Sequence, residues 1–447
     1  MKLTTEYLYS QLIPYCATVN KIFVGYSGGV DSHVLLHLLA NIPQLKHKIT
    51  AVYVHHGLQS CADDWAEHCQ QVAKALAVNF RVIRVNAQAD QGQSPEEAAR
   101  NARYQAFKDI LTINDVLLFA QHRNDQLETV LLQLFRGAGL KGLSGMPAAR
   151  EFSKGMLLRP FLDVNQDSIT QYARQNNLQW IEDPSNQDTR FERNYLRQKI
   201  IPLLEQRWPG IDTAVSRVAG HCAQAQTALS ASAQVKLHLL YDPNQQCLSI
   251  SRLLTHDDLT QQWIIREWMH LLGVRMPTQK VLTAILQDVL SARQGANPVV
   301  RHDGYNIQRY RDGLYLVPEK KNPDLNQVIN WVDHKESLSL PDNSKLVPRD
   351  AQQGIAMNVW QQGSIQVKYR QGGEKIALAN RAGRHSLKKL YQEAGIALWQ
   401  RNVIPLVYIN GELAAVAGYW VSADFYVQNE VCINLLWQQT DKENISK

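Results

Sequence analysis

Residues 21–40 read KIFVGYSGGVDSHVLLHLLA, and this stretch decides the fold of the N-terminal part of the chain. Its first residues have the apolar pattern of a strand, and those after Gly29 have the pattern of a helix. The bend, Ser27–Ser32, therefore lies at the carboxyl end of a strand and at a helix N-terminus, where a parallel sheet places its ligand. Gly28 and Gly29 allow close approach of the backbone, and two flanking hydroxyls add hydrogen-bonding groups. The stretch therefore predicts a phosphate site.

This bend differs from two common phosphate loops. No Gly-Lys-Ser/Thr follows the glycines, as a Walker loop requires, and the G-x-G-x-x-G fingerprint of dinucleotide sites is absent. The alternative interpretation is a tight turn in which Asp31 or Ser32 caps the helix. The complete string between a strand and a helix favours a nucleotide site. The expected phosphate-binding residues are Ser27, Gly28, Gly29, Val30, Asp31 and Ser32.

Length and hydropathy bound the class of protein. A chain of 447 residues predicts about three domains, which we place at residues 1–210, 211–320 and 321–447 from the changes in pattern described below. No stretch approaches the roughly 18 uncharged apolar residues of a membrane span. The N-terminus lacks the charged-then-apolar pattern of a secretion signal, so we expect a cytoplasmic protein without a membrane partner.

Cysteine and histidine spacings argue against a structural metal. The six cysteines are scattered and include no C-x-x-C pair, so we expect free thiols and no zinc or iron–sulfur site. His55 and His56 end the second predicted strand, but no further ligand lies at a spacing that fits zinc. We favour a strand-end turn that lines the nucleotide pocket.

Positive charge is concentrated near the C-terminus. The net charge is +6, and residues 364–420 alone contain eight Lys or Arg residues against three Asp or Glu residues. Arg384, Lys388 and Lys389 belong to a basic loop that enters a helix in this segment. Polyanion binding requires such clustering, although an ordinary solvated face has the same composition. Charge alone therefore favours a nucleic-acid partner only slightly.

Strand and helix patterns alternate through residues 1–210, which predicts an α/β fold with a parallel, doubly wound sheet. The predicted strands are Lys21–Ser27, Ile49–His56, Phe80–Asn86 and Asp115–His122. The predicted helices are Asp31–Ala40, Asp63–Leu76, Ser94–Leu111, which Ser94 is expected to cap, and Asn124–Arg136. A fifth unit is expected, with a helix over Gln166–Asn177 that leads to a strand at Gln179–Asp183.

The pattern changes after residue 210. Residues 211–300 are predicted to be mainly helical with a break at Tyr241–Asn244, and residues 300–317 are predicted to form a hairpin with Asp-Gly turns. A linker is expected at Pro318–Asp324. The remainder mixes short strands with one helix near Leu387–Ala394, which predicts a small α+β domain.

Three residues suited to acid–base chemistry follow the fourth predicted strand: His122, Asp125 and Glu128. If that strand lies next to the first, they face Ser27–Ser32 across one crevice, because ligands bind where a doubly wound sheet reverses its strand order. Two carboxylates three residues apart on a helix suit metal coordination or capture of an amine. The same spacing is also that of a capping box, so this segment leaves both interpretations open.

Arginines form two further clusters. Arg100 and Arg103 make a cationic ridge on the third helix, which suits bidentate phosphate contacts or a solvated face. Arg193 and Arg197 are four residues apart, with Tyr195 between them. Basic residues interleaved with aromatics are common where unstacked bases are bound, and equally common on a helix that packs its own aromatic side chains.

Together these motifs resemble the tRNA(Ile)-lysidine synthetase family, within the superfamily of PP-loop ATP pyrophosphatases. They occur in family order and span nearly the whole chain. The matching motifs are SGGVDS (27–32), VHHGL (54–58), EEAARNARY (96–104), QHRNDQLET (121–129), RGAGLKGLSGMP (136–147), IEDPSN (181–186) and RNYLR (193–197), followed by VKYRQGGEKI and GRHSLKKLYQEAGIALWQRNVIPLVY. The resemblance implies an ATP-binding domain, a helical middle domain that binds substrate and tRNA, and a C-terminal tRNA-binding domain.

The resemblance also implies a reaction. A ligase of this family uses ATP to adenylate the wobble cytidine of a tRNA(Ile) with a CAU anticodon. The amine of free lysine then displaces AMP to form lysidine, so that the tRNA reads AUA as isoleucine. The implied partners are ATP, Mg²⁺, lysine and this tRNA, and a homodimer is compatible with the sequence.

Residue roles follow from the same resemblance. Ser27–Ser32 would hold the diphosphate, Asp31 would bind Mg²⁺ or position the reacting centre, and His122 would assist proton removal. Asp125 and Glu128 would hold the lysine ammonium. The residues expected to neutralise charge during adenylyl transfer are Arg100, Arg103 and Arg197. The residues expected to contact tRNA are Arg193, Asn194, Arg384, Lys388 and Lys389.

The chain departs from the family pattern in two places. The family has His-His and Asp-Asp where this chain has Gln121-His122 and Asn124-Asp125, so no role of the first member of each pair is carried over. Ala397-Leu398 replaces a Pro-Pro pair, which affects loop stiffness.

Three rival functions share part of the pattern. An amidotransferase or a synthetase of small metabolites has the same loop but would not need the basic C-terminal segment. A tRNA thiolation enzyme has the same loop but relies on cysteine pairs that are missing from this sequence. A non-catalytic nucleotide- or RNA-binding module would use the loop and the basic segment without releasing diphosphate.

Overall fold

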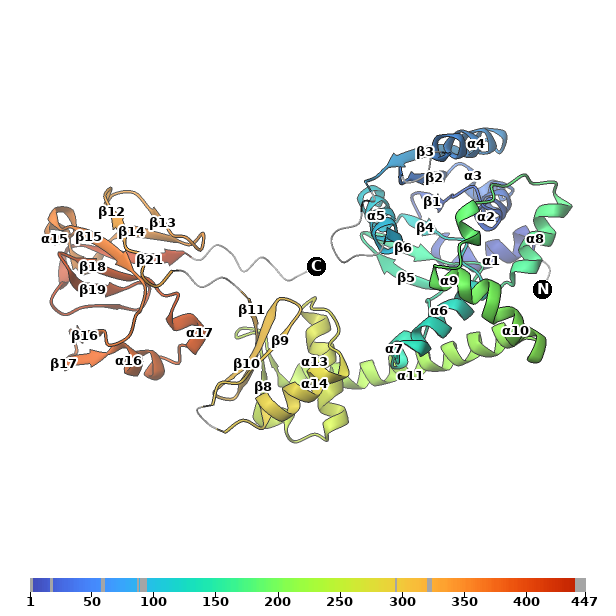
Figure 1. Cartoon of the computed structure of the whole chain (residues 1–447). Helices are drawn as coiled ribbons and strands as arrows, with labels where there is room; N and C mark the ends of the chain where they lie inside the picture. The colour runs from blue at the N-terminus through green and yellow to red at the C-terminus, as the bar shows by residue number, and fades with distance from the viewer. Residues whose placement is uncertain are drawn as a thin grey trace. The chain divides into compact units, whose positions relative to one another are not determined.

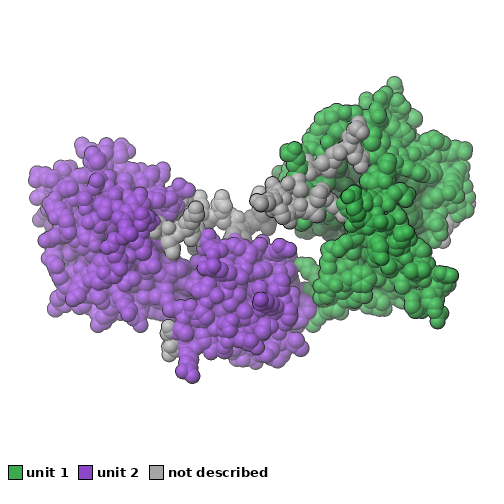
Figure 2. Space-filling model, viewed as in Figure 1, with its two compact units in different colours: residues 1–229 green, residues 230–447 purple. Residues whose placement is uncertain are grey.

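The computed structural model describes residues 3–16, 19–57, 61–86, 88, 95–293, 296–319 and 324–438. The chain divides into two compact units, Met1–Leu229 and Ser230–Lys447 (Figure 2). The predicted cap Ser94 and most of the predicted linker, Lys320–Pro323, lie outside the described residues. The domain boundaries that we place at residues 210 and 320 stay predictions.

A six-stranded sheet organises the first unit, with the order β3-β2-β1-β4-β6-β5 (Figure 1). Every neighbouring pair is parallel except β5 and β6. The central strand β1 pairs Val24 with Ala51 of β2 on one side and with Leu118 of β4 on the other. The predicted doubly wound sheet is confirmed. The strands are β1 (Ile22–Gly25), β2 (Ile49–His55), β3 (Asn79–Arg84), β4 (Val116–Leu118), β5 (Ala149–Phe152) and β6 (Gly155–Leu158).

Helices cover both faces of this sheet because neighbouring residues of a strand point to opposite faces. Val24 packs in one core with Leu8 of α1 and Leu35 of α2, and Phe23 packs in the other with Phe107 of α5. The helices are α1 (Thr5–Cys16), α2 (Val30–Ala40), α3 (Pro43–Lys46), α4 (Ala62–Ala75), α5 (Pro95–Ile110), α6 (Arg123–Phe135), α7 (Leu140–Leu143), α8 (Gln166–Gln175), α9 (Glu192–Tyr195) and α10 (Ile201–Arg207), with a 3₁₀ turn at Pro184–Gln187 and a π-helix at Leu196–Ile200.

The prediction of a fifth strand at Gln179–Asp183 is wrong. The helix before it is present as α8, but the sheet position beside β4 is taken by the β5–β6 hairpin. Residues 179–183 instead run over the bend after β1, where the amide of Ile181 donates to the carbonyl of Gly28 at 2.9 Å. This segment therefore covers the loop and does not extend the sheet.

The second unit begins with helices and a five-stranded sheet of order β7-β8-β11-β10-β9. The predicted hairpin with Asp-Gly turns is confirmed as β9, β10 and β11, and a short β7–β8 hairpin occupies the predicted helix break. Their bounds are α11 (Ile211–Leu240, which begins in the first unit), β7 (Tyr241–Asp242), β8 (Cys247–Ser249), α12 (Ile250–Leu253), α13 (Asp258–Leu271), α14 (Gln279–Ala284), a π-helix at Ile285–Leu290, β9 (Val299–His302), β10 (Tyr305–Tyr310) and β11 (Gly313–Pro318).

The rest of the second unit is the predicted α+β part, built on antiparallel strands. Its sheets have the orders β12-β15-β18-β19-β20, β13-β14-β21 and β16-β17. The elements are β12 (Ile329–Trp331), β13 (Leu338–Ser339), β14 (Lys345–Ala356), α15 (Met357–Gln362), β15 (Ile365–Lys368), β16 (Lys375–Leu378), β17 (Arg381–Ser386), α16 (Leu387–Glu393), α17 (Leu398–Arg401), β18 (Leu406–Ile409), β19 (Glu412–Val416), β20 (Trp420–Val421) and β21 (Tyr426–Gln438).

Candidate active site at the carboxyl edge of the parallel sheet

The loop between β1 and α2 leaves the first N–H groups of α2 without a side-chain cap. Gly29 is the N-cap of α2, and no side chain caps this helix, so the alternative in which Asp31 or Ser32 serves as the cap is wrong. The first N–H groups of a helix have no partner within it and attract anions. The hydroxyl of Ser32 instead braces the loop, because it accepts from the amide of Ser27 at 3.2 Å and donates to the carbonyl of Gly29 at 3.0 Å.

Gly28 is required where it stands. Its φ is +84°, in the left-handed region that favours glycine. A Cβ there would lie 2.5 Å from Cδ1 of Ile181 and 3.0 Å from Sγ of Cys69. The loop is therefore pressed between α4, which carries Cys69, and the segment that carries Ile181.

Strand order brings the second set of candidates beside this loop. β1 and β4 are parallel neighbours, and the chain passes from β1 to β2 on one side and returns to β4 on the other. The adjacency assumed from the sequence is therefore confirmed. His122 lies just after β4 and is the N-cap of α6, so its side chain and Asp31 meet at the same edge.

His122 lies between two carboxylates and is only 1% exposed. Its Nε2 lies 3.7 Å from Oδ2 of Asp31 and 3.6 Å from Oδ2 of Asp125. Burial by itself lowers the pKa of His122, but the carboxylates of Asp125 and Asp31 outweigh burial and raise the pKa above its ordinary 6.5. Asp125 also accepts from the backbone amide of His122 at 3.0 Å, so it caps the helix as well as facing the site.

Glu128 is fully buried and bound by arginine. Its Oε1 accepts from Nε of Arg197 at 2.7 Å, and its Oε2 lies 3.9 Å from Nη1 of Arg193. Arg197 also lies 3.3 Å from Oδ1 of Asp125. Burial raises the pKa of Glu128 despite the opposing charge of Arg197. Burial lowers the pKa of Arg197, but Glu128 and Asp125 outweigh burial and raise it, so the guanidinium stays charged.

The two arginines come from consecutive helical elements, Arg193 from α9 and Arg197 from the π-helix that follows it. Leu196–Ile200 has π geometry directly after α9, a form that is frequent at functional sites. Leu196 is buried with Leu127 of α6, so the segment packs against α6 through its aliphatic side chain. Nη2 of Arg193 donates to Oγ1 of Thr129 at 3.2 Å, beside its contact with Glu128.

Arg100 and Arg103 lie on α5 and are not joined to these carboxylates by any described contact. The guanidinium of Arg100 stacks on the ring of Tyr104 at 5.2 Å. The pKa of His56 is lowered to about 4, mainly by burial and further by the positive charge of Arg103. Arg103 therefore lies near the carboxyl end of β2, at the same edge of the sheet as the loop.

The residues that depart from the family pattern have structural partners, which sequence reasoning missed. Gln121 accepts through Oε1 from Nε of Arg159, a side chain that is only 4% exposed. Arg159 also donates to the carbonyl of Pro147 at 2.7 Å. Asn124 accepts through Oδ1 from the amide of Gln166 at the start of α8. No sequence signal links these residues, because 38 and 42 positions separate the partners.

The tRNA-contact candidates differ in their surroundings. The amide of Asn194 donates to the carbonyls of Ser185 and Asp188, both at 2.9 Å, and so holds the turn before α9. Lys388 and Lys389 are exposed on α16, and Lys389 lies 4.0 Å from Glu393. Arg384 is exposed on β17, 3.2 Å from Asp424.

The described side chains alone provide too few ligands for a magnesium ion, so substrate phosphates would have to complete its coordination. Oδ1 of Asp31 is buried and has no hydrogen-bond partner among the described residues. Within the same part of the chain, no three His, Cys, Asp or Glu side chains form a group that could hold a metal. Mg²⁺ is typically bound by one or two carboxylates together with substrate phosphates, which is what Asp31 beside the loop offers.

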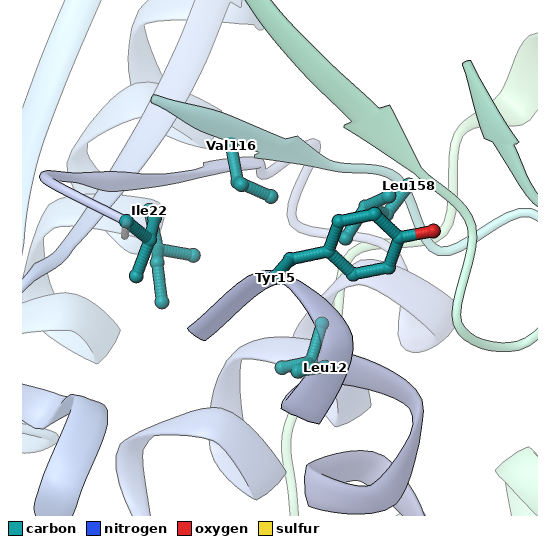
Figure 3. Close-up of a pocket in the computed structure, with 6 residues that line it drawn as sticks. Leu12, Tyr15, Ile22, Val116 and Leu158 are labelled. Carbon is teal, nitrogen blue, oxygen red and sulfur yellow. The ribbon is translucent and has the colours of Figure 1, made fainter. Parts of the chain in front are cut away.

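An apolar pocket in the first unit is separate from this site (Figure 3). It is lined by Leu12 and Tyr15 of α1 and by Ile22 and Val116 at the starts of β1 and β4, with Val19 and Leu158 completing the lining. It therefore opens between α1 and the sheet, away from the edge that carries Asp31 and His122. Among the helices that the structure describes, none is long and apolar enough to cross a membrane.

The raised pKa of His122 predicts a pH-dependent stability. A group whose pKa is higher in the folded than in the unfolded protein stabilises the folded state. This stabilisation is complete at pH values below the unfolded-state pKa, and it is lost as the pH rises through the folded-state pKa. The wild type should therefore have a higher free energy of unfolding than His122→Gln. This difference should be largest at pH values below 6.5, the ordinary pKa of histidine, and should shrink at alkaline pH. Urea unfolding at a series of pH values measures this difference.

His37 provides the matched control. Burial lowers its pKa, so the excess of the wild type over His37→Gln should grow as the pH rises. A difference for His122→Gln that is constant, or that grows with pH, contradicts the described pairing with Asp31 and Asp125.

Three family models match separate segments of the chain, and curated relatives match most of its length. Residues 1–204 match the family described as PP-loop domain, residues 248–315 the TilS substrate binding domain, and residues 365–437 the TilS substrate C-terminal domain. The chain is 40% identical to a tRNA(Ile)-lysidine synthase of Coxiella burnetii over 410 residues, which are 91% of this chain and 90% of the relative. It is 39% identical to that of Proteus mirabilis over 93% of this chain and 95% of the relative, and 37% identical to that of Legionella pneumophila over 96% and 98%. The resemblance inferred from the motifs is confirmed, and the chain belongs to the tRNA(Ile)-lysidine synthase family.

Proposed function

We propose that this chain is a cytoplasmic ligase that converts the wobble cytidine of a CAU-anticodon tRNA(Ile) to lysidine, using ATP and lysine. The observation that carries the proposal is the meeting of Asp31, His122 and Asp125 beside an uncapped helix N-terminus that can hold phosphate. A nucleotide, an amine and a proton acceptor can then be brought together at one edge of the sheet. Every residue proposed for this site comes from a single copy of the chain.

Adenylyl transfer is the first step. The ring carbonyl oxygen of the cytidine attacks the α-phosphorus of ATP, and the bond from that phosphorus to the oxygen bridging it to the β-phosphate breaks. The loop Ser27–Ser32 holds the departing diphosphate through the N–H groups of α2. Asp31 would hold Mg²⁺ through its unpartnered Oδ1, and the ion would supply neutralisation of phosphate charge. Arg100, Arg103 and Arg197 add positive charge around the site.

Lysine attack is the second step. The amine forms a bond to the activated ring carbon, and the bond from that carbon to the oxygen of AMP breaks. Asp125 attracts the lysine ammonium, and His122 beside it accepts the proton that the amine must lose. Glu128 has no exposed surface, so we assign it the role of fixing Arg197 beneath Asp125.

The experiment mixes the purified full chain with ATP, Mg²⁺, labelled lysine and a tRNA(Ile) transcript carrying a CAU anticodon. Label should enter the transcript, with release of AMP and diphosphate in equal amounts. Lack of label in the RNA, or diphosphate release that does not need the transcript, contradicts the proposal.

Asp125→Asn separates the two steps. The amide can still accept from the backbone of His122 and so preserve the helix start, but it no longer attracts an ammonium. We expect lysine incorporation to fall by about 100-fold while diphosphate release that depends on the transcript continues. The matched control is Asp109→Asn, an exposed residue of α5 that should leave both readouts unchanged. Unchanged lysine incorporation in Asp125→Asn would refute the assignment.

The basic face of α16 is proposed to bind tRNA phosphates. In Lys388→Ala combined with Lys389→Ala, the apparent KM for tRNA should rise about tenfold at moderate salt, and the salt dependence of binding should weaken by about two charges. ATP binding should not change. The control replaces Lys335 and Lys345, which are exposed elsewhere in the same unit. Equal effects of the two double variants would mean that α16 has no special role.

A further inference from the structure

The segment that carries Arg193 and Arg197 has a second, outward face. Phe191 is 37% exposed and Tyr195 is 49% exposed, and Lys199 is exposed one turn further along. We call these three residues the aromatic ridge. Among the described residues, no hydrogen bond or ion pair is formed by the ammonium of Lys199.

The inward face explains why the ridge points outward. Arg193 and Arg197 reach Thr129, Glu128 and Asp125 of α6, while Leu196 packs against Leu127. Residues two positions apart on a helix lie on nearly opposite sides, so Tyr195 is directed away from both arginines. Leu196 is buried in this helix, whereas Tyr195 is 49% exposed, which favours the interpretation in which Tyr195 is available to a ligand.

Neighbouring charges leave the ridge with a net positive character. Glu192 lies beside Phe191, but its carboxylate is paired with Nη2 of Arg136 at 2.6 Å. Exposed rings next to an unpaired ammonium are complementary to a single-stranded nucleic acid, whose bases have π faces and whose backbone is anionic.

We propose that the aromatic ridge stacks unpaired bases of the substrate's anticodon loop, next to the cytidine that enters the site. The inference rests on the proposed function. A base that leaves its stack deprives its neighbours of a stacking partner, and exposed aromatic side chains replace that partner. The ridge lies on the segment whose other face fixes Asp125 and Glu128, so it is within a few residues of the site that takes the flipped base.

The test compares ring-removing and ring-preserving variants of the full chain. One double variant carries Phe191→Leu and Tyr195→Leu, the other Phe191→Tyr and Tyr195→Phe. Binding is measured by fluorescence anisotropy with an anticodon stem-loop RNA and with the same stem closed by a tight tetraloop, and lysine transfer to tRNA is followed in parallel. Trp208→Leu, an exposed aromatic outside the ridge, is the matched control.

We expect the leucine variant to lose about 10- to 100-fold in affinity for the anticodon stem-loop, with a matching rise in KM for tRNA and little change in kcat. The leucine variant and the wild type should bind the tetraloop RNA equally well. The ring-preserving variant and Trp208→Leu should match the wild type in affinity for the anticodon stem-loop and in lysine transfer. An unchanged leucine variant, or a ring-preserving variant that is equally defective, would overturn the proposal. If one of these two contradicting results is found while the wild type transfers lysine, the proposed function stands and only the ridge assignment falls. If the wild type transfers none, the proposed function itself fails.

Discussion

The parallel pairing of β1 with β4 is the constraint on which the candidate site depends. Neighbouring strands lie about 4.8 Å apart, so Asp31 and His122, which follow their carboxyl ends, meet although 91 positions separate them in the chain. The loops leave in different directions at this point, since the chain leads from β1 to β2 on one side of the sheet and from β4 to the β5–β6 hairpin on the other. Asp31 and His122 are brought together by this topology, and no local feature of either loop is sufficient to do so.

Burial of the charged Glu128 on α6 costs free energy, so its presence there calls for a reason other than stability. Glu128 is fully buried, and a buried ion pair often stabilises a protein less than apolar residues of the same volume. The side chain of Arg197 is 40% exposed, so the larger penalty, about 3 to 5 kcal/mol, is expected when Arg197 is removed and the buried carboxylate of Glu128 loses its closest partner. The Glu128–Arg197 pair is therefore better understood as a device that fixes orientation. It holds a guanidinium beside Asp125, whose carboxylate also faces His122.

Local sequence signals were sufficient for the loop and the central strands, and insufficient for the groups that cover and brace them. The glycines of Ser27–Ser32 predict a bend between a strand and a helix, because the backbone freedom of glycine depends on the residue itself and not on distant contacts. The closure over Gly28 by Ile181 is a contact between segments 153 positions apart, and local composition does not distinguish such a covering segment from a strand of the sheet. The pairing of Gln121 with Arg159 and the direction of Tyr195 depend on packing, which periodicity does not encode.

A crystal structure of the chain with an ATP analogue that cannot be cleaved between the α- and β-phosphates tests the central claim most directly. The account predicts that the terminal phosphates rest on the N–H groups of Ser27–Ser32, with the α-phosphate facing Asp31 and His122. Density for the triphosphate at another edge of the sheet, or side chains of Asp31 and His122 turned away from it, would contradict the account.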